Sequence, residues 1–229
     1  MNAEVIYLPG AGSAGLAFEP LQRLVPGRVI PIPDHDTVQA MASAIACEME
    51  DRGGPRILVG ASLGAMVALE LYGRVRIDGW VLIAAGTGIR VDGSLFRMLE
   101  ATPESAAGKL ARAGLVDAEH DRDLLEIRVC DFEARGVATM ANHFRALAAY
   151  EPAPIENPPP TFVIWGTRDR AVSFESHLEL STALAGALIP IDGAGHAPFL
   201  ERPPEVARWI DDLAAIVSAR ELTGKGADA

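Results

Sequence analysis

Four short apolar runs alternate with segments of helical periodicity up to residue 86, and this alternation constrains the fold more than any other feature. The runs are EVIYL (4–8), RVIPIP (28–33), RILVG (56–60) and GWVLIAAG (79–86). A helix with Asp36 as its candidate cap is predicted over Thr37 to Asp51, and another over residues 62–74. Strands that alternate with helices form parallel βαβ units. The chain is therefore predicted to be an α/β protein with a mostly parallel sheet flanked by helices.

This alternation is interrupted after Gly88. From about Gly88 to Glu151 the sequence is alanine-rich, charged and compatible with helix, and it ends in the proline-rich connector EPAPIENPPP. The strand–helix pattern then resumes with TFVIWG (161–166), a helix near 173–185, ALIPI (187–191) and a final helix from about Pro204. We predict a core formed by residues 1–87 and 152–229, interrupted by a helical insertion at residues 88–151.

Charge and cysteine content exclude several classes of partner. The net charge of −11 opposes binding to nucleic-acid phosphates. Cys47 and Cys130 have neither metal-ligand spacing nor a disulfide framework, as is typical of a reducing compartment. The N-terminus lacks a signal-peptide pattern, and the longest nearly apolar stretch, 57–69, is too short to span a bilayer. We expect a cytoplasmic protein that binds neither nucleic acid nor a membrane.

Ser62 stands between two glycines, in GASLG (60–64), where a predicted buried strand gives way to a helix. A strained turn of this kind lifts a nucleophilic serine above the sheet, and it requires very small residues on both sides. The alternative is an ordinary tight turn in which the serine caps the helix. The sequence context favours the nucleophile.

A nucleophilic serine needs a base, and the base needs an acid to orient it. Asp169 follows the strand 161–166, and His196 lies in a glycine-rich loop after the strand 187–191. Catalytic groups of parallel sheets gather at the carboxyl ends of the strands, so these two residues and Ser62 are expected at one edge. The chain order serine, aspartate, histidine is that of the α/β-hydrolase triad.

The segments GASLG, WGTRD and GAGHAPFLERPPEV (193–206) together resemble the α/β-hydrolase superfamily. Over essentially the whole chain, the resemblance is to small capped carboxylesterases of the pimeloyl-[acyl-carrier protein] methyl ester esterase kind and to related lactonases. It implies the α/β-hydrolase fold with residues 88–151 as a helical cap. It also implies that a small-molecule acyl ester is hydrolysed through an acyl-enzyme without a cofactor, with Ser62 attacking, His196 as base and then acid, and Asp169 orienting His196.

The resemblance also assigns two backbone donors to the oxyanion, the N–H groups of Ala11 and Leu63. Two departures accompany it. The family usually has His-Gly where this chain has Pro9-Gly10, so the function of that histidine side chain is absent here. Family members also tend to begin with an antiparallel hairpin, whereas this chain starts almost directly at the strand 4–8, and a smaller sheet is expected.

The loop YLPGAGSAG (7–15) has a second interpretation. Its glycines from Gly10 to Gly15 also fit the G-x-G-x-x-G pattern of a dinucleotide-binding turn, with Asp34 further along the chain. In that case the helix would begin within the motif and Pro20 would lie in its interior, at a cost of about 3 kcal/mol. In a hydrolase the helix begins later and Pro20 falls in its first turn. Pro20 therefore favours the hydrolase.

Other polar residues are given structural roles. The acidic cluster Asp34–Asp36 is predicted to be a solvated loop and helix cap, and no metal site is expected. His120, His143 and His177 are predicted to be surface or cap residues, although a place for His143 in the pocket stays open. The arginines of the insertion are predicted to form a solvated helical surface, with docking of an acidic acyl carrier protein as the alternative. They are Arg90, Arg97, Arg112, Arg122, Arg128, Arg135 and Arg145.

Three other functions remain open on the sequence alone. The same triad serves carbon–carbon bond hydrolases as well as thioesterases and lactonases. A nicotinamide-binding oxidoreductase would use the loop Gly10–Gly15. A receptor-like binding protein would keep the triad but turn over slowly.

Overall fold

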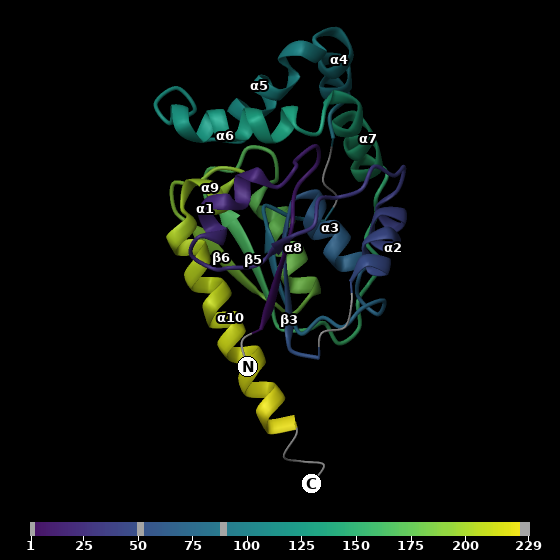
Figure 1. The fold of residues 1–229 in the computed structure, drawn as a ribbon, viewed down its shortest axis with the longest axis vertical. Helices are drawn as coiled ribbons and strands as arrows, with labels where there is room; N and C mark the ends of the chain where they lie inside the picture. Colours follow the sequence, from purple (N-terminus) through teal and green to yellow (C-terminus); the bar gives the residue numbers. More distant parts are fainter. Residues whose placement is uncertain (1–2, 50–52, 88–90, 225–229) are drawn as a thin grey trace.

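A computed structural model describes residues 3–49, 53–87 and 91–224, and its strands form a single sheet (Figure 1). The strands are β1 (Glu4–Leu8), β2 (Arg28–Val29), β3 (Arg56–Ala61), β4 (Gly79–Ile83), β5 (Thr161–Gly166) and β6 (Ala187–Ile191). Their order is β2-β1-β3-β4-β5-β6, and every neighbouring pair is parallel. The predicted mostly parallel sheet is confirmed.

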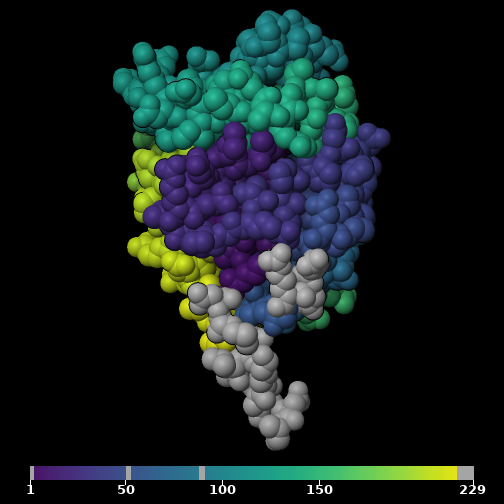
Figure 2. Space-filling view, in the orientation of Figure 1, coloured from purple at the N-terminus to yellow at the C-terminus, as the bar shows by residue number. Residues whose placement is uncertain are grey.

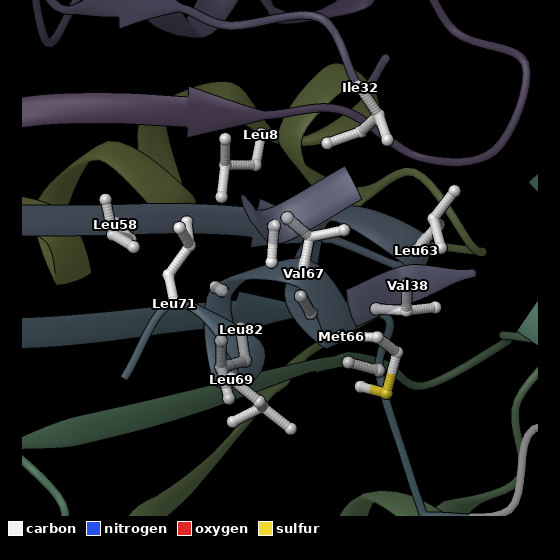
Figure 3. Packing of buried hydrophobic residues seen from close by; sticks show 14 of the residues in the cluster. Leu8, Ile32, Val38, Leu58, Leu63, Met66, Val67, Leu69, Leu71 and Leu82 are labelled. Carbon is white, nitrogen blue, oxygen red and sulfur yellow. The ribbon is translucent and has the colours of Figure 1, made fainter. Parts of the chain in front are cut away.

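Helices cover both faces of this sheet. The core helices are η1 (Leu16–Phe18), α1 (Glu19–Gln22), α2 (Val38–Glu48), α3 (Leu63–Glu70), α8 (Phe174–Ala183), α9 (Pro198–Glu201) and α10 (Pro203–Gly224). Alternate side chains of each strand point to opposite faces. On β1, Ile6 and Leu8 belong to an apolar cluster that includes side chains of α2, α3 and α8, whereas Val5 and Tyr7 belong to a second cluster that includes side chains of α1, α9 and α10. Figure 3 shows part of the first cluster, with Leu8 on its strand and Val67 on α3.

Two local expectations need correction. The helix α2 is capped by Thr37, whose hydroxyl accepts a hydrogen bond from the backbone N–H of Ala40 at 3.1 Å, and not by Asp36. The predicted strand 28–33 is reduced to two residues in β2, at the edge of the sheet. Pro31 and Pro33 carry no N–H to continue the ladder, which explains why the strand ends early.

In the described part of the chain between β4 and β5, four helices form what we call the α4–α7 layer. They are α4 (Gly93–Ala101), α5 (Pro103–Ala113), α6 (Arg122–Glu133) and α7 (Val137–Ala148). The layer has a small apolar cluster of its own, which includes Leu99 and Phe132. It lies over the edge toward which the strand arrows point (Figure 1), and the space-filling view shows it as a continuous layer on the core (Figure 2). Residues 88–90 of the predicted insertion fall outside the described residues.

Within the described ranges, no helix is both long enough and apolar enough to cross a membrane.

Candidate active site

Ser62 occupies the sharp turn between β3 and α3. Its φ of 50° and ψ of −115° place it in a region that costs a residue with a Cβ about 1–3 kcal/mol. The flanking glycines are required by close packing. A Cβ on Gly64 would lie 2.0 Å from the carbonyl oxygen of Leu8, and one on Gly60 would lie 2.6 Å from that of Gly64. The Ser62 hydroxyl makes no capping hydrogen bond to α3, so the helix-cap alternative does not describe it.

His196 is held by the carboxylate of Asp169. The Nδ1 atom of His196 lies 2.9 Å from Oδ2 of Asp169, whose side chain is fully buried. Oδ1 of Asp169 accepts the backbone N–H groups of Ala171 and Val172 at 2.7 and 3.1 Å. Burial alone would raise the pKa of Asp169, but the charge of His196 and these hydrogen bonds outweigh it and hold the pKa below its ordinary value. Asp169 is therefore ionised at neutral pH.

Ser62 and His196 line the same pocket, which lies between the core and the α4–α7 layer. Its volume is about 310 Å³, at the small end of the range for ligand pockets. The layer supplies apolar walls, among them Leu95, Leu110 and Phe144. The structure thus brings a strained serine and a carboxylate-bound histidine to one small, mostly apolar cavity.

The loop that follows β1 also reaches this pocket. Gly10 and Ala11 line it, and a Cβ built on Gly10 would lie 3.5 Å from the Cβ of Ser62. The glycine loop ends before the helices begin, and Pro20 lies in the first turn of α1, as predicted for a hydrolase. Leu63 directly follows Ser62 as the first residue of α3, and its side chain is buried.

The prediction that His143 is a surface or cap residue is wrong. His143 lies on α7 and is fully buried, and its Nδ1 accepts a hydrogen bond from the backbone N–H of Gly12 at 3.1 Å. Its Nε2 lies 3.1 Å from the carbonyl oxygen of Pro33, to which it donates. Burial, the largest influence, lowers the pKa of His143. The periodicity of α7 carried a signal for this, because Met140 and Leu147 place His143 on the buried stripe of the helix.

Two other histidines, His120 and His177, were also predicted to be surface or cap residues, and of these two only His120 matches its prediction. His177 is also buried, contrary to expectation, and its Nδ1 donates to the carbonyl oxygen of Ser173 at 2.7 Å. His120 is exposed and pairs with Asp117 at 2.7 Å, as expected of a surface residue.

Arg90 lies outside the described residues, and among the other arginines assigned to the solvated surface Arg128 and Arg135 are exceptions. Arg128 is 7% exposed and lines the pocket, and Arg135 donates to the carbonyl oxygen of Ile32.

The acidic cluster Asp34–Asp36 makes direct contacts with α7, since Asp34 accepts hydrogen bonds from Asn142 and Thr139 at 2.6 and 3.1 Å. No cluster of three metal-ligating side chains occurs within residues 3–49, 53–87 and 91–224.

Known proteins resemble this chain in sequence pattern and in fold. Residues 5–209 match the model of the family described as the alpha/beta hydrolase family. None of the curated proteins matches the chain. Among solved structures, a thermophilic esterase superposes with a TM-score of 0.82 at 22% identity, covering 93% of this chain and 90% of that chain.

Two further structures share the fold over nearly their whole length. The enol-lactonase from Burkholderia xenovorans LB400 superposes with a TM-score of 0.77 at 19% identity, covering 94% of this chain and 92% of that chain. The type II thioesterase BorB from the borrelidin biosynthetic cluster gives a TM-score of 0.70 at 18% identity, with 93% of each chain covered. Because the family model spans nearly the whole chain and the sheet has the matching architecture, the protein belongs to the alpha/beta hydrolase family and has the α/β-hydrolase fold.

Proposed function

We propose that this protein is a serine hydrolase that cleaves a carboxylic ester, a thioester or a lactone through an acyl-enzyme. One observation supports this most directly. His196, with Nδ1 against Asp169, and Ser62, in a strained turn, line the same pocket. Membership of a hydrolase family adds to it, as do structural neighbours named as an esterase, an enol-lactonase and a thioesterase.

The geometry around His196 supports its role as a base. A carboxylate only accepts hydrogen bonds, so the proton between His196 and Asp169 belongs to Nδ1. Nε2 then keeps a lone pair that takes the proton of the Ser62 hydroxyl as the oxygen attacks the substrate carbonyl. His196 returns this proton to the leaving group, and a water molecule deacylates the enzyme by the same route. Asp169 remains ionised and stabilises the imidazolium.

The oxyanion that forms during attack needs preorganised donors. We assign the backbone N–H groups of Ala11 and Leu63 to it. Leu63 begins α3, and the first N–H groups of a helix have no acceptor within the helix. Ala11 stands in the loop that packs against Ser62 and lines the same pocket. No cofactor is needed for this chemistry.

We further propose that residues 88–151 act as a cap that sets the length and shape of the acyl group. This proposal is supported by Leu95, Leu110 and Phe144, which extend from three different helices of the α4–α7 layer to line the pocket above Ser62. A pocket of about 310 Å³ favours a small acyl or alcohol group.

A fluorophosphonate probe tests the nucleophile. The wild-type protein should be labelled once, and Ser62→Ala should abolish labelling. Ser43→Ala is the matched control, because Ser43 is an exposed serine on α2 that donates to Gln39, and its loss should leave labelling intact. Labelling that survives Ser62→Ala would contradict the proposed nucleophile.

The bond type is tested by a substrate series. Nitrophenyl esters of increasing acyl length, the corresponding acyl thioesters, simple lactones and a diketone should be compared under the same conditions. We expect turnover of one or more of the oxygen esters, thioesters or lactones and a clear optimum in acyl length. Turnover of the diketone alone would replace the proposal by carbon–carbon bond hydrolysis. Labelling without turnover of any substrate would indicate a binding protein.

A further inference from the structure

Arg128 is a buried cation in a pocket that is otherwise mostly apolar. It extends from α6 and lines the same cavity as Ser62 and His196. Its side chain is only 9% exposed. An arginine stays protonated even when buried, so its charge must be compensated inside the protein or by a ligand. The groups around Arg128 show how much of this charge the protein itself compensates.

The hydrogen-bonding capacity of the guanidinium is not used by its neighbours. Nε of Arg128 has no hydrogen-bond partner in the described part of the chain. Nη1 lies 3.9 Å from Oδ2 of Asp131, which is an ion-pair distance but too long for a hydrogen bond. One face of the guanidinium lies over the ring of Phe132, with 4.4 Å from Cζ to the ring centroid. The planar group is thus supported on one face, and Nε is buried without a partner, so a ligand in the pocket would have to be bound through the terminal Nη groups.

The nearby carboxylates are occupied by other donors. Asp131 is fully buried, and its oxygens accept the Ser13 hydroxyl at 2.6 Å and the backbone N–H of Leu16 at 2.8 Å. Glu201 adds a negative charge near Arg128, and its own oxygens accept the N–H groups of Val116 and Gly195 at 2.8 and 2.7 Å. These carboxylates balance charge near Arg128 without saturating its donors.

We infer that Arg128 is a specificity-determining residue that binds a carboxylate of the substrate, so that the natural substrate is a small ester, thioester or lactone bearing a second, free carboxylate. The guanidinium fork matches a carboxylate in two parallel hydrogen bonds, and it does so best where water is excluded. A second cation, Arg170, lines the pocket from an exposed position. Among the described residues that line the pocket, the one acidic residue is Asp92, which is exposed and caps α4 through the N–H of Ser94 at 2.8 Å.

This inference rests on the proposed function. A matched pair of substrates tests carboxylate recognition by Arg128 separately from hydrolysis itself. Mono-4-nitrophenyl adipate carries a terminal carboxylate, and the corresponding adipamic acid ester carries a neutral carboxamide of nearly the same size. Wild-type enzyme should prefer the carboxylate by about tenfold or more in kcat/KM, mainly through KM, since a charged hydrogen-bonded pair is formed on binding. The net charge of −11 works against anionic substrates generally, so this preference would have to come from the site.

Variants of Arg128 should change this ratio. Arg128→Met should lower the ratio of the two kcat/KM values by about tenfold or more, and Arg128→Lys should lower it less, because lysine keeps the charge but lacks the fork. Lysine also keeps a cation beside Asp131, so it tests the ratio if the methionine variant is unstable. Arg122→Met, an exposed arginine on the same helix, should keep the wild-type ratio.

Binding provides a readout that needs no turnover. Adipate should bind the Ser62→Ala protein more tightly than adipamide does, and Arg128→Met in the same background should abolish that difference in calorimetry. A ratio of kcat/KM near one in the wild type, or an unchanged ratio in Arg128→Met, would show that Arg128 only balances Asp131, and the hydrolase proposal would stand. Absence of labelling at Ser62, or of turnover of every oxygen ester, thioester and lactone tested, would overturn the proposed function and this inference with it. Turnover of other substrates but of neither adipate-derived ester would overturn this inference alone.

Discussion

The imidazole of His143 accepts a hydrogen bond from the backbone N–H of Gly12, 131 residues earlier in the chain, at a distance of 3.1 Å. This contact joins α7 to the glycine loop beside Ser62. The Nε2 atom of the same ring donates to Pro33, so the neutral ring uses both of its nitrogens. Protonation would turn the acceptor into a donor facing the N–H of Gly12. The loop that carries Ala11 is therefore held in place by a neutral histidine of the α4–α7 layer.

Acid should destabilise the protein through its buried histidines. Burial holds the pKa values of His143 and His177 below the ordinary 6.5, so the unfolded chain takes up these protons at a higher pH than the folded one. Their contribution to the free energy of unfolding is fully present above pH 6.5 and is lost as the pH falls below it. Thermal unfolding between pH 7.5 and about pH 5 should show Tm falling, and His143→Gln should make this dependence shallower.

The matched control for this prediction is His120→Gln. His120 is exposed and paired with Asp117, and an exposed pair of this kind contributes little to stability. The pH dependence of Tm in this variant should match that of the wild type. If Tm of His143→Gln depended on pH as steeply as that of the wild type, protonation of His143 would not be coupled to folding.

Asp169→Asn should leave the fold intact and remove most of the activity. An asparagine of similar shape can donate to Nδ1 of His196, which favours the tautomer with its proton on Nε2 and so removes the base. We expect kcat to fall by about 10³- to 10⁴-fold with a smaller change in KM. Asp192→Asn is the control, because Asp192 is an exposed aspartate that accepts from Thr167 at 3.2 Å, and its kcat should stay near that of the wild type. An active Asp169→Asn enzyme would exclude the proposed triad.

Two leucines one turn apart on α4 separate a lining role from a packing role. Leu95 lines the pocket, whereas Leu99 is buried in the apolar cluster of the α4–α7 layer and does not line the pocket. Leu95→Ala should shift the preferred acyl length of nitrophenyl esters toward longer chains with little change in Tm. Leu99→Ala should destabilise the protein by about 2–4 kcal/mol and leave the relative preference among chain lengths unchanged. Equal losses on all chain lengths in Leu95→Ala would mean that the layer does not select the substrate.

The core of this fold could be predicted from the sequence because its signals are local. Buried parallel strands show as short apolar runs and their helices as apolar periodicity. The strands β1, β4, β5 and β6 lie within the predicted segments, and β3 extends one residue beyond its own, to Ala61. The strand β2 was predicted too long, because Pro31 and Pro33 break the ladder within an otherwise strand-like run. The cap of α2 was predicted at Asp36, one residue before the observed cap Thr37, because two residues of capping types stand side by side there.

The candidate site was only partly predictable, because some of its residues are placed by contacts between distant parts of the chain. Ser62, Asp169 and His196 each follow a strand at the same edge of a parallel sheet, so topology alone places them near one another. His143 and Asp131 pair with the loop after β1 across 131 and 118 residues, to Gly12 and Ser13, and no local pattern records such pairing. The burial of Arg128 likewise depends on how the α4–α7 layer packs on the core.

Ala11→Pro tests the oxyanion loop directly. A backbone donor can be removed only by a residue without an N–H, and proline is that residue. If the Ala11 N–H stabilises the oxyanion, kcat should drop by about 10²- to 10³-fold with KM less affected, because the interaction strengthens in the transition state. Gly10, which precedes it, tolerates the backbone restriction that proline places on its neighbour better than other residues would.

Ala11→Gly is the matched control for this substitution, since it alters the side chain but keeps the N–H, and it should retain most of the wild-type kcat. An unchanged thermal transition and continued labelling at Ser62 would show that Ala11→Pro is folded, even if labelling slows. The assignment of Ala11 is contradicted by a folded proline variant with the kcat of the wild type. NADH should then be titrated against the wild-type protein, because the loop from Gly10 to Gly15 would again be a candidate for dinucleotide binding.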